Sequence, residues 1–235
     1  VMLGIVFIIW AIALYRGVKP VMKMNQPWAL PNWLVYATFS IIFLLLSGFV
    51  ATPRTNFVIA DFWRWMVVHM WAEAFFEVFT TVLIGYFMVL MGLVSKQAVV
   101  RVIYLATLLF LGSGLLGISH NFYWNAKPVA TMALGSVFST LQVIPLVLLT
   151  LEAWRFSKLP GILENKNAVN GDLNKRFGFS EVFLFLVAVN FWNFFGAGVL
   201  GFIINLPIAN YYEHGTYLTV NHGHAALMGV YGNLA

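Results

Sequence analysis

The stretch HGHAALMG, residues 222–229, holds two histidines separated by a single glycine. Successive residues of a helix turn by about 100°, so His222 and His224 should point about 200° apart. They cannot bind one metal ion, but they can serve two groups on opposite flanks of one helix. Imidazole is a common ligand of iron and haem. We therefore favour ligation by this pair over the alternative of two polar residues that cap a helix at a membrane interface.

A second stretch, HMWAEAFFE at residues 69–77, sets a histidine and two glutamates at a spacing of four. His69, Glu73 and Glu77 then form one stripe along a helix, with a drift of about 40° for each step of four residues. An ionised carboxylate near the middle of a membrane costs about 2.5–3.5 kcal/mol. Two on one face indicate a metal, a water-filled path or a proton route. The alternative is a pair of protonated glutamates satisfied by neighbouring helices.

A third candidate is the pair His120–Asn121 in GISHNFYW, residues 117–124, where an apolar run ends. Adjacent residues of a loop can both reach one metal, whereas adjacent residues of a helix cannot. Asparagine at a helix end is also common for capping, so the pair depends on what it meets in space. His214, in NYYEHGT, is either a structural loop histidine or the border of a cofactor, and the sequence leaves both open.

The composition of the chain indicates that these residues belong to a membrane protein. Only 9% of the residues are charged, against about 25% in soluble domains, and the mean hydropathy is +0.86. The chain has no cysteine, which excludes a disulfide framework and a thiolate metal site. No cleavable signal pattern is visible. Both ends lie inside apolar runs, so we expect residues 1–235 to be a single transmembrane catalytic domain, truncated at both ends.

Apolar runs long enough to cross a bilayer predict an all-α polytopic membrane protein. A spanning helix needs about 20 such residues. Seven stretches qualify, at about 1–15, 33–51, 63–94, 97–119, 128–154, 179–205 and from 217 to the end. The polar segment 155–178 is expected to be an extramembrane loop.

The Lys and Arg residues set the orientation, because cytoplasmic loops are enriched in them. The connections after the first, third and fifth runs, with their flanks, carry most of these residues: Arg16, Lys19, Lys23, Lys96, Arg101, Arg155, Lys158, Lys166, Lys175 and Arg176. The opposite side carries Arg54, Arg64 and Lys127. The net charge of +5 is therefore a topology signal, and no nucleic-acid partner is expected. All five histidines fall toward the non-cytoplasmic side, where four can converge in one layer.

The histidine motifs at residues 69–77, 117–124 and 222–229 resemble those of the catalytic subunit of the haem–copper oxidase superfamily, in its nitric oxide reductase branch. The resemblance covers essentially the whole chain. The resemblance implies a subunit I helix bundle in which His222 binds a high-spin haem b and His224 a low-spin haem b. It also implies that His69, His120, Glu73 and Asn121 are the ligands of a non-haem metal. Oxygen-reducing members typically carry a tyrosine at the place of Glu73. A carboxylate is a hard donor that suits iron better than copper, so non-haem iron is expected.

Two positions depart from the reductase pattern. The reductases carry a second histidine where this chain has Asn121, and a glutamate where it has Gln142, in FSTLQVIP, residues 138–145. Both changes resemble nitric oxide dismutases, which are relatives of the quinol-dependent reductases. Gln142 cannot titrate, and Asn121 offers an amide oxygen, a weaker donor than imidazole. Glu73 and Glu77 remain available for proton chemistry.

The resemblance implies disproportionation of two NO to N2 and O2, with Glu73, Glu77, Asn121 and Gln142 as catalytic residues. The alternatives are quinol-dependent reduction of NO to N2O, a transporter or proton channel without haem, and a divergent oxygen reductase or inactive member. The implied partners are nitric oxide and the lipid bilayer, with a quinol left open. The implied location is the bacterial inner membrane, with the metal centre toward the periplasm.

Overall fold

The computed structural model describes residues 2–91, 94–123, 128–141, 143–145, 147–148, 151 and 180–234. These residues form helices and connections, with no strand among them. The expected loop 155–178 and Gln142 lie outside the described residues, as does part of the expected span 128–154.

Five continuous helical stretches in the described part of the chain are long and apolar enough to cross a membrane. They are Met2–Val21, Leu30–Val50, Phe57–Leu90, Lys96–Phe122 and Leu184–Ile204. A shorter apolar helix covers Val129–Pro145. The last expected span, from residue 217, is helical over Tyr217–Leu234 but is not among the five. The all-helical membrane fold predicted from the apolar runs is confirmed.

The chain divides into two compact units. Unit 1 comprises Val1–Leu83 and Ile103–Ser139, and unit 2 comprises Ile84–Val102 and Thr140–Ala235. The main helices are α1 (Met2–Val18), α2 (Leu30–Ser47), α3 (Phe57–Val68), α4 (Phe76–Leu90), α5 (Lys96–Leu116), α6 (Val129–Thr140), α10 (Ser180–Trp192), α11 (Leu200–Ile204), α12 (Pro207–Glu213), α13 (Tyr217–His224) and α14 (Gly232–Leu234). Short segments extend them: η1 (Lys19–Val21), η2 (Gly48–Val50), η3 (His69–Phe75), η4 (Gly117–Phe122), η5 (Asn193–Val199) and η6 (Ala225–Tyr231).

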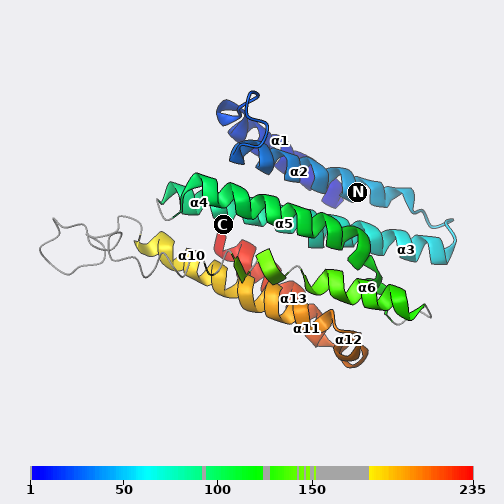
Figure 1. Ribbon diagram of the computed structural model, residues 1–235. Coiled ribbons are helices and arrows are strands. Elements are labelled where there is room, and N and C mark those ends of the chain that lie inside the picture. The colour runs from blue at the N-terminus through cyan, green and yellow to red at the C-terminus, as the bar shows by residue number, and fades with distance from the viewer. Residues whose placement is uncertain are drawn as a thin grey trace, which may run out of the picture. The chain divides into compact units, whose positions relative to one another are not determined.

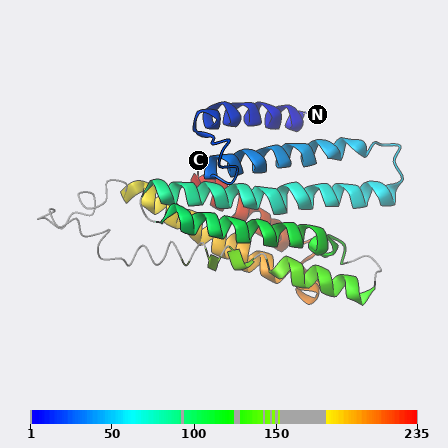
Figure 2. The same cartoon turned by 45° about the horizontal axis from the view of Figure 1, so that its top comes forward.

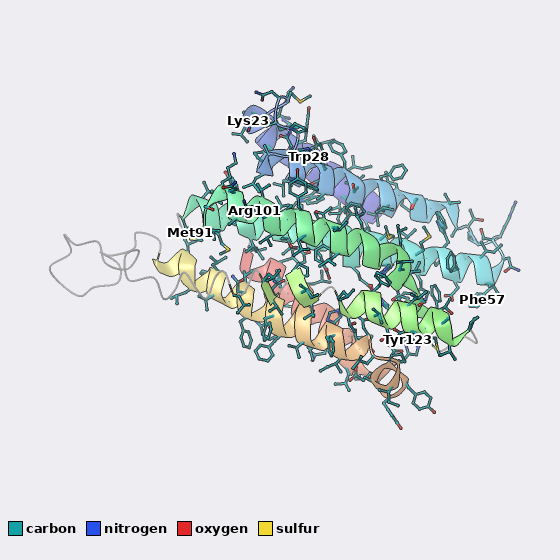
Figure 3. The ribbon with its side chains drawn as sticks, in the orientation of Figure 1. Lys23, Trp28, Phe57, Met91, Arg101 and Tyr123 are labelled. Carbon is teal, nitrogen blue, oxygen red and sulfur yellow. The ribbon has the colours of Figure 1, made fainter. Side chains whose placement is uncertain are left out.

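In unit 1, α1 and α2 lie side by side (Figures 1 and 2), and α2 also packs against η3. Fully buried apolar side chains such as Ile41 stabilise this packing. Asn32 fixes the connection before α2, because its side chain accepts from the backbone N–H of Lys23 at 3.1 Å and donates to the Lys23 carbonyl at 3.0 Å. Within this unit, Lys23 lies at one end and Phe57 and Tyr123 lie toward the other (Figure 3). Successive connections therefore alternate between ends, as a polytopic bundle requires.

In unit 2, the helix that runs from α10 through η5 to α11 packs against the segment α13–η6–α14, coloured red at its end in Figure 1. The N-terminus of α13 is capped by Thr216, whose hydroxyl accepts from the Leu218 N–H at 3.2 Å. Gly215 before it has φ 77, a left-handed conformation that favours glycine. This sharp turn after α12 leads directly into the helix that carries His222 and His224.

Among the described residues, π-helical turns occur at η3, η5 and η6. Such turns are rare and occur often at functional sites, because the widened turn redirects the side chains around it. Here η3 begins at His69, η5 contains Gly196, and η6 follows directly after His224. The apolar runs carried no signal for these turns.

Candidate metal and haem sites

The first site is built on the π-helical segment η3 of unit 1. His69 begins this segment and is completely buried. Its Nδ1 lies 2.6 Å from Oε2 of Glu73, four residues later. The spacing seen in the sequence therefore brings an imidazole and a carboxylate into direct contact.

The third member of the group comes from η4, also in unit 1. His120 is buried, and its Nε2 lies 2.9 Å from the same Glu73 oxygen. The rings of His69 and His120 are T-shaped, with centroids 4.8 Å apart. Two imidazole nitrogens thus converge on one carboxylate oxygen, and ligand atoms of the three residues all lie within 4.8 Å of one another. No other group of this kind is found in the described part of the chain.

This donor set fits a transition metal. Two histidines and one carboxylate with further positions open are the ligand set of non-haem Fe(II) sites. A half-buried carboxylate that faces two imidazoles also supplies negative charge to balance a cation. The three residues therefore can hold a divalent iron.

Asn121 and Glu77 lie close to these ligands in the sequence. Asn121 follows His120 in the 3₁₀ helix η4, where the sequence analysis expected a loop. Its side chain is buried, and no hydrogen-bond partner is found for Nδ2 among the described residues. Oε2 of Glu77 is likewise buried and without a partner in that part of the chain. Since buried polar atoms are normally satisfied, both side chains have hydrogen-bonding capacity left for a small molecule or water.

Tyr123 follows η4 directly and lies just beyond the apolar span Lys96–Phe122. Burial raises the pKa of Tyr123 to about 12, against a hydrogen bond with Ser136 that lowers it. The phenol therefore stays protonated at physiological pH.

The second site lies in unit 2 around His222. The ring of His222 has Nδ1 2.7 Å from the carbonyl oxygen of Gly196, in η5. Because a carbonyl only accepts, Nδ1–H donates to it, and in the neutral ring Nε2 is the unprotonated nitrogen. A neutral imidazole with an unprotonated Nε2 is the form that ligates haem iron. Such an axial site needs a single protein ligand, because the porphyrin supplies the other four nitrogens.

Two glycines make room for this ring. A Cβ on Gly201 would lie 2.9 Å from Cε1 of His222, and a Cβ on Gly196 would lie 2.7 Å from Cβ of Ala225. Side chains at either position would displace the ring or the backbone that holds it. The glycines of η5 and α11 thus permit the close contact between this helix and α13–η6.

The remaining predicted residues lie apart from this contact. His224 is exposed, whereas His222 is half-buried, as their expected angular separation requires. His214 follows α12 and is exposed, with its backbone N–H donating to the Asn210 carbonyl at 2.8 Å. The sequence did not reveal which oxygens lie against Nδ1 of the two histidines. They are the hydroxyl of Ser139 for His120 and the carbonyl of Gly196 for His222. Ser139 lies in the stretch FSTLQVIP that was singled out for Gln142, but nothing in that stretch linked it to a histidine.

Comparison with known proteins shows the family to which the chain belongs. The family model of cytochrome c and quinol oxidase polypeptide I matches residues 1–235. The chain belongs to this family. It is that of haem–copper oxidase subunit I, whose members are membrane redox enzymes that bind haem and metal. The superfamily predicted from the motifs is therefore confirmed, and membership in a redox enzyme family argues against the transporter or channel.

Within the family, the chain is similar to a nitric oxide reductase polypeptide of Stutzerimonas stutzeri. The two are 29% identical over 170 residues, which cover 72% of this chain and 33% of that relative. The chain thus spans about a third of the length of the relative that it matches. As a member of the oxidase polypeptide I family with several apolar spans, it is a multi-pass membrane protein.

Proposed function

We propose that this chain forms the catalytic part of a membrane oxidoreductase that disproportionates nitric oxide, 2 NO → N2 + O2. The observation that carries the proposal is the converging group of His69, Glu73 and His120, followed directly by Asn121 instead of a further histidine. The similarity to a nitric oxide reductase polypeptide supports nitric oxide as the substrate.

In this proposal, His69, His120 and Glu73 hold a non-haem iron, whose open positions supply a redox-active site for NO. Glu73 faces both imidazoles through one oxygen, so it fixes their mutual geometry as well as their charge. Asn121 contributes a neutral amide in place of an imidazole. An amide oxygen is a weaker donor than imidazole, so the metal site stays more open than one with three histidines.

On the haem side, we propose that His222 is the axial ligand of a high-spin haem b and His224 a ligand of a low-spin haem b. The Gly196 carbonyl keeps His222 in the tautomer that this role requires. The exposed side chain of His224 lies outside that contact and can meet a different group.

The proton demand of the two reactions, together with the substitution at Gln142, favours dismutation. Reduction of two NO to N2O and water consumes two electrons and two protons, so a reductase needs a proton feed. Dismutation consumes neither from outside. Gln142 cannot titrate, which removes a proton-relay group from the place where the reductases carry a glutamate.

Reduction of NO to N2O is the second candidate. The observation in its favour is that two carboxyls, Glu73 and Glu77, remain one helical turn apart, and Glu77 keeps a buried oxygen without a partner among the described residues. Such a group could carry protons toward the metal site. Electrons would then have to come from a donor such as a quinol.

Isotope labelling separates the two reactions. Anoxic membranes that hold the full chain are given ¹⁵N¹⁸O without an electron donor, and the gas phase is followed by mass spectrometry. Dismutation gives ¹⁵N2 and ¹⁸O2 in equal amounts. If ¹⁵N2O alone forms, and only when a quinol is added, the protein is a reductase. His222→Ala membranes serve as the control for chemistry by other proteins.

We also propose that the protein resides in the bacterial inner membrane with the metal site in the periplasmic half. The bias of Lys and Arg toward alternate connections supports this orientation. Because the chain has no cysteine, a single Thr55→Cys variant should react with an impermeant maleimide from the periplasmic side. Reaction from the cytoplasmic side would reverse the orientation.

A further inference from the structure

The contact between η4 and α6 in unit 1 places a serine against the metal-site histidine His120. Oγ of Ser139 lies 2.5 Å from Nδ1 of His120. The same hydroxyl lies 3.2 Å from the carbonyl oxygen of Gly117 and donates to it. The opposite ring nitrogen, Nε2, faces Glu73. His120 is thus held between a hydroxyl on one side and the metal-site carboxylate on the other.

We infer that Ser139 is a positioning residue for the non-haem metal site, because it accepts the Nδ1–H of His120 and leaves Nε2 as the metal-binding nitrogen. The inference rests on the proposed metal site, and adds to it the group that selects the tautomer of one ligand. Histidines that bind metals commonly donate their other N–H to such an outer partner, which fixes the ring and raises its basicity.

The number of hydrogens available supports donation from Nδ1 of His120 to Oγ of Ser139. Ser139 has one hydroxyl hydrogen, and the Gly117 carbonyl can only accept, so donation to Gly117 leaves Oγ as an acceptor. Nδ1 of His120 must then carry the hydrogen, and Nε2 is unprotonated. In the reverse arrangement Ser139 would donate to Nδ1, the Gly117 carbonyl would lose its hydroxyl donor, and Nε2–H would point at Glu73. A proton on Nε2 would occupy the position that the metal needs.

The serine and the histidine are both buried in a close helix contact. Ser139 is 2% exposed and His120 is 8% exposed. A Cβ on Gly117 would lie 2.8 Å from Oγ of Ser139, and a Cβ on Gly135 would lie 3.1 Å from the backbone nitrogen of His120. Glycines at both positions allow α6 to approach η4 closely.

Two variants of the full chain test the inference by metal binding. In Ser139→Ala the hydroxyl is lost, and the affinity of the non-haem site for Fe²⁺ should fall about 10–100-fold, the range known for outer-shell partners. Ser119→Ala is the matched control. Ser119 lies at the same helix contact but donates to the Thr131 carbonyl at 2.5 Å. Its loss should leave Fe²⁺ affinity unchanged, and Ser139→Thr, which keeps the hydroxyl, should recover part of the lost affinity.

A second readout makes its main observation on the wild-type protein. In ¹⁵N-histidine-labelled wild-type protein loaded with diamagnetic Zn²⁺, solid-state NMR should show a protonated Nδ1 and a metal-bound Nε2 for one histidine. That signal should be absent in His120→Gln.

The possible outcomes separate the two proposals. A wild-type protein that binds neither Fe²⁺ nor Zn²⁺ outside its haems would overturn the metal site and the inference together. A wild-type protein in which His120 binds the metal through Nδ1, with the hydrogen on Nε2, would overturn the role of Ser139 alone. Equal Fe²⁺ affinities for Ser139→Ala and Ser119→Ala would do the same.

Discussion

His120 in unit 1 and His222 in unit 2 both have Nδ1 against an oxygen, but the two oxygens differ in kind. His120 meets the side-chain hydroxyl of Ser139, whereas His222 meets the backbone carbonyl of Gly196. A carbonyl can only accept, so the tautomer of His222 follows from backbone geometry alone. A hydroxyl can donate or accept, so the tautomer of His120 also depends on the Gly117 carbonyl, which takes the serine hydrogen.

The two sites also differ in the number of donors. In unit 1 two imidazoles and a carboxylate converge, which suits a bare ion that must take all its protein ligands from side chains. Around His222 no such group is found among the described residues, which suits a cofactor that brings four nitrogens of its own. If both proposed assignments hold, the number of converging side chains, more than the presence of histidine, distinguishes the ion site from the haem site in this protein.

The largest expected effect is the loss of a cofactor from the one-ligand site. His222→Ala should abolish the high-spin haem signal completely, because in our proposal this one imidazole is the protein's ligand to that haem. His224→Ala should instead remove the low-spin signal. Absorption spectra of the reduced proteins, with and without CO, measure both. A His222→Ala protein with its high-spin haem intact would show that the unit 2 site is not a haem site.

The ion site should lose its metal more gradually, because three donors share the ion. Glu73→Ala removes the oxygen that faces both imidazoles and should weaken Fe²⁺ binding by more than about 100-fold, beyond the effect of an outer-shell partner. Glu77→Gln, one turn further along and outside the donor group, should keep the affinity of the wild type. Titration of the metal-depleted protein with Fe²⁺ compares the two. The same affinity for both variants would remove Glu73 from the ligand set.

A backbone acceptor can be disturbed only through packing. In Gly196→Ala the new Cβ would lie 2.7 Å from Cβ of Ala225 and 3.0 Å from its carbonyl carbon. Such overpacking should destabilise the protein by about 1–3 kcal/mol and lower its high-spin haem content. Gly112→Ala, where nothing lies within 4 Å of the added Cβ, should keep both. Thermal unfolding and haem quantification measure the pair, and normal haem content in Gly196→Ala would mean that the η5 carbonyl does not position His222.

The contrast between the sites also explains what could be predicted from the sequence. Apolar runs predicted the helical spans, because the length of a run needed to cross a bilayer is set by the helix rise. The contact between His69 and Glu73 followed from their spacing of four residues. Both are local properties of one helix, and the periodicity of the sequence carries them.

The acceptors of the two ring nitrogens could not be predicted in this way. Ser139 is 19 residues from His120, and Gly196 is 26 residues from His222. These contacts depend on how helices pack, and an acceptor that is a backbone carbonyl has no residue type to reveal it. The π-helical turns were missed for a related reason, because a shift of one backbone hydrogen bond leaves the apolar pattern almost unchanged.

The smallest and most specific effect concerns Asn121, beside the ion site. Asn121→His would place a second imidazole next to His120, as the reductase pattern has it. We expect tighter binding of non-haem iron and a shift of labelled products from ¹⁵N2 and ¹⁸O2 toward ¹⁵N2O when an electron donor is present. Asn121→Ala, which removes the amide without adding a donor, is the control and should not produce the shift.

Iron affinity and product ratio, both measured on Asn121→His, distinguish a role of Asn121 in iron binding from a role in the choice of product. If iron binds more tightly but the product ratio is that of the wild type, Asn121 stands in the place of a ligand without deciding the reaction. If neither changes, the buried amide of Asn121 does not face the metal at all. Since its Nδ2 has no partner among the described residues, a shift in products without a gain in iron affinity would assign the amide to the bound gas rather than to the ion. In that case the opening in the ligand set, and not the weaker donor, would distinguish this site from that of a reductase.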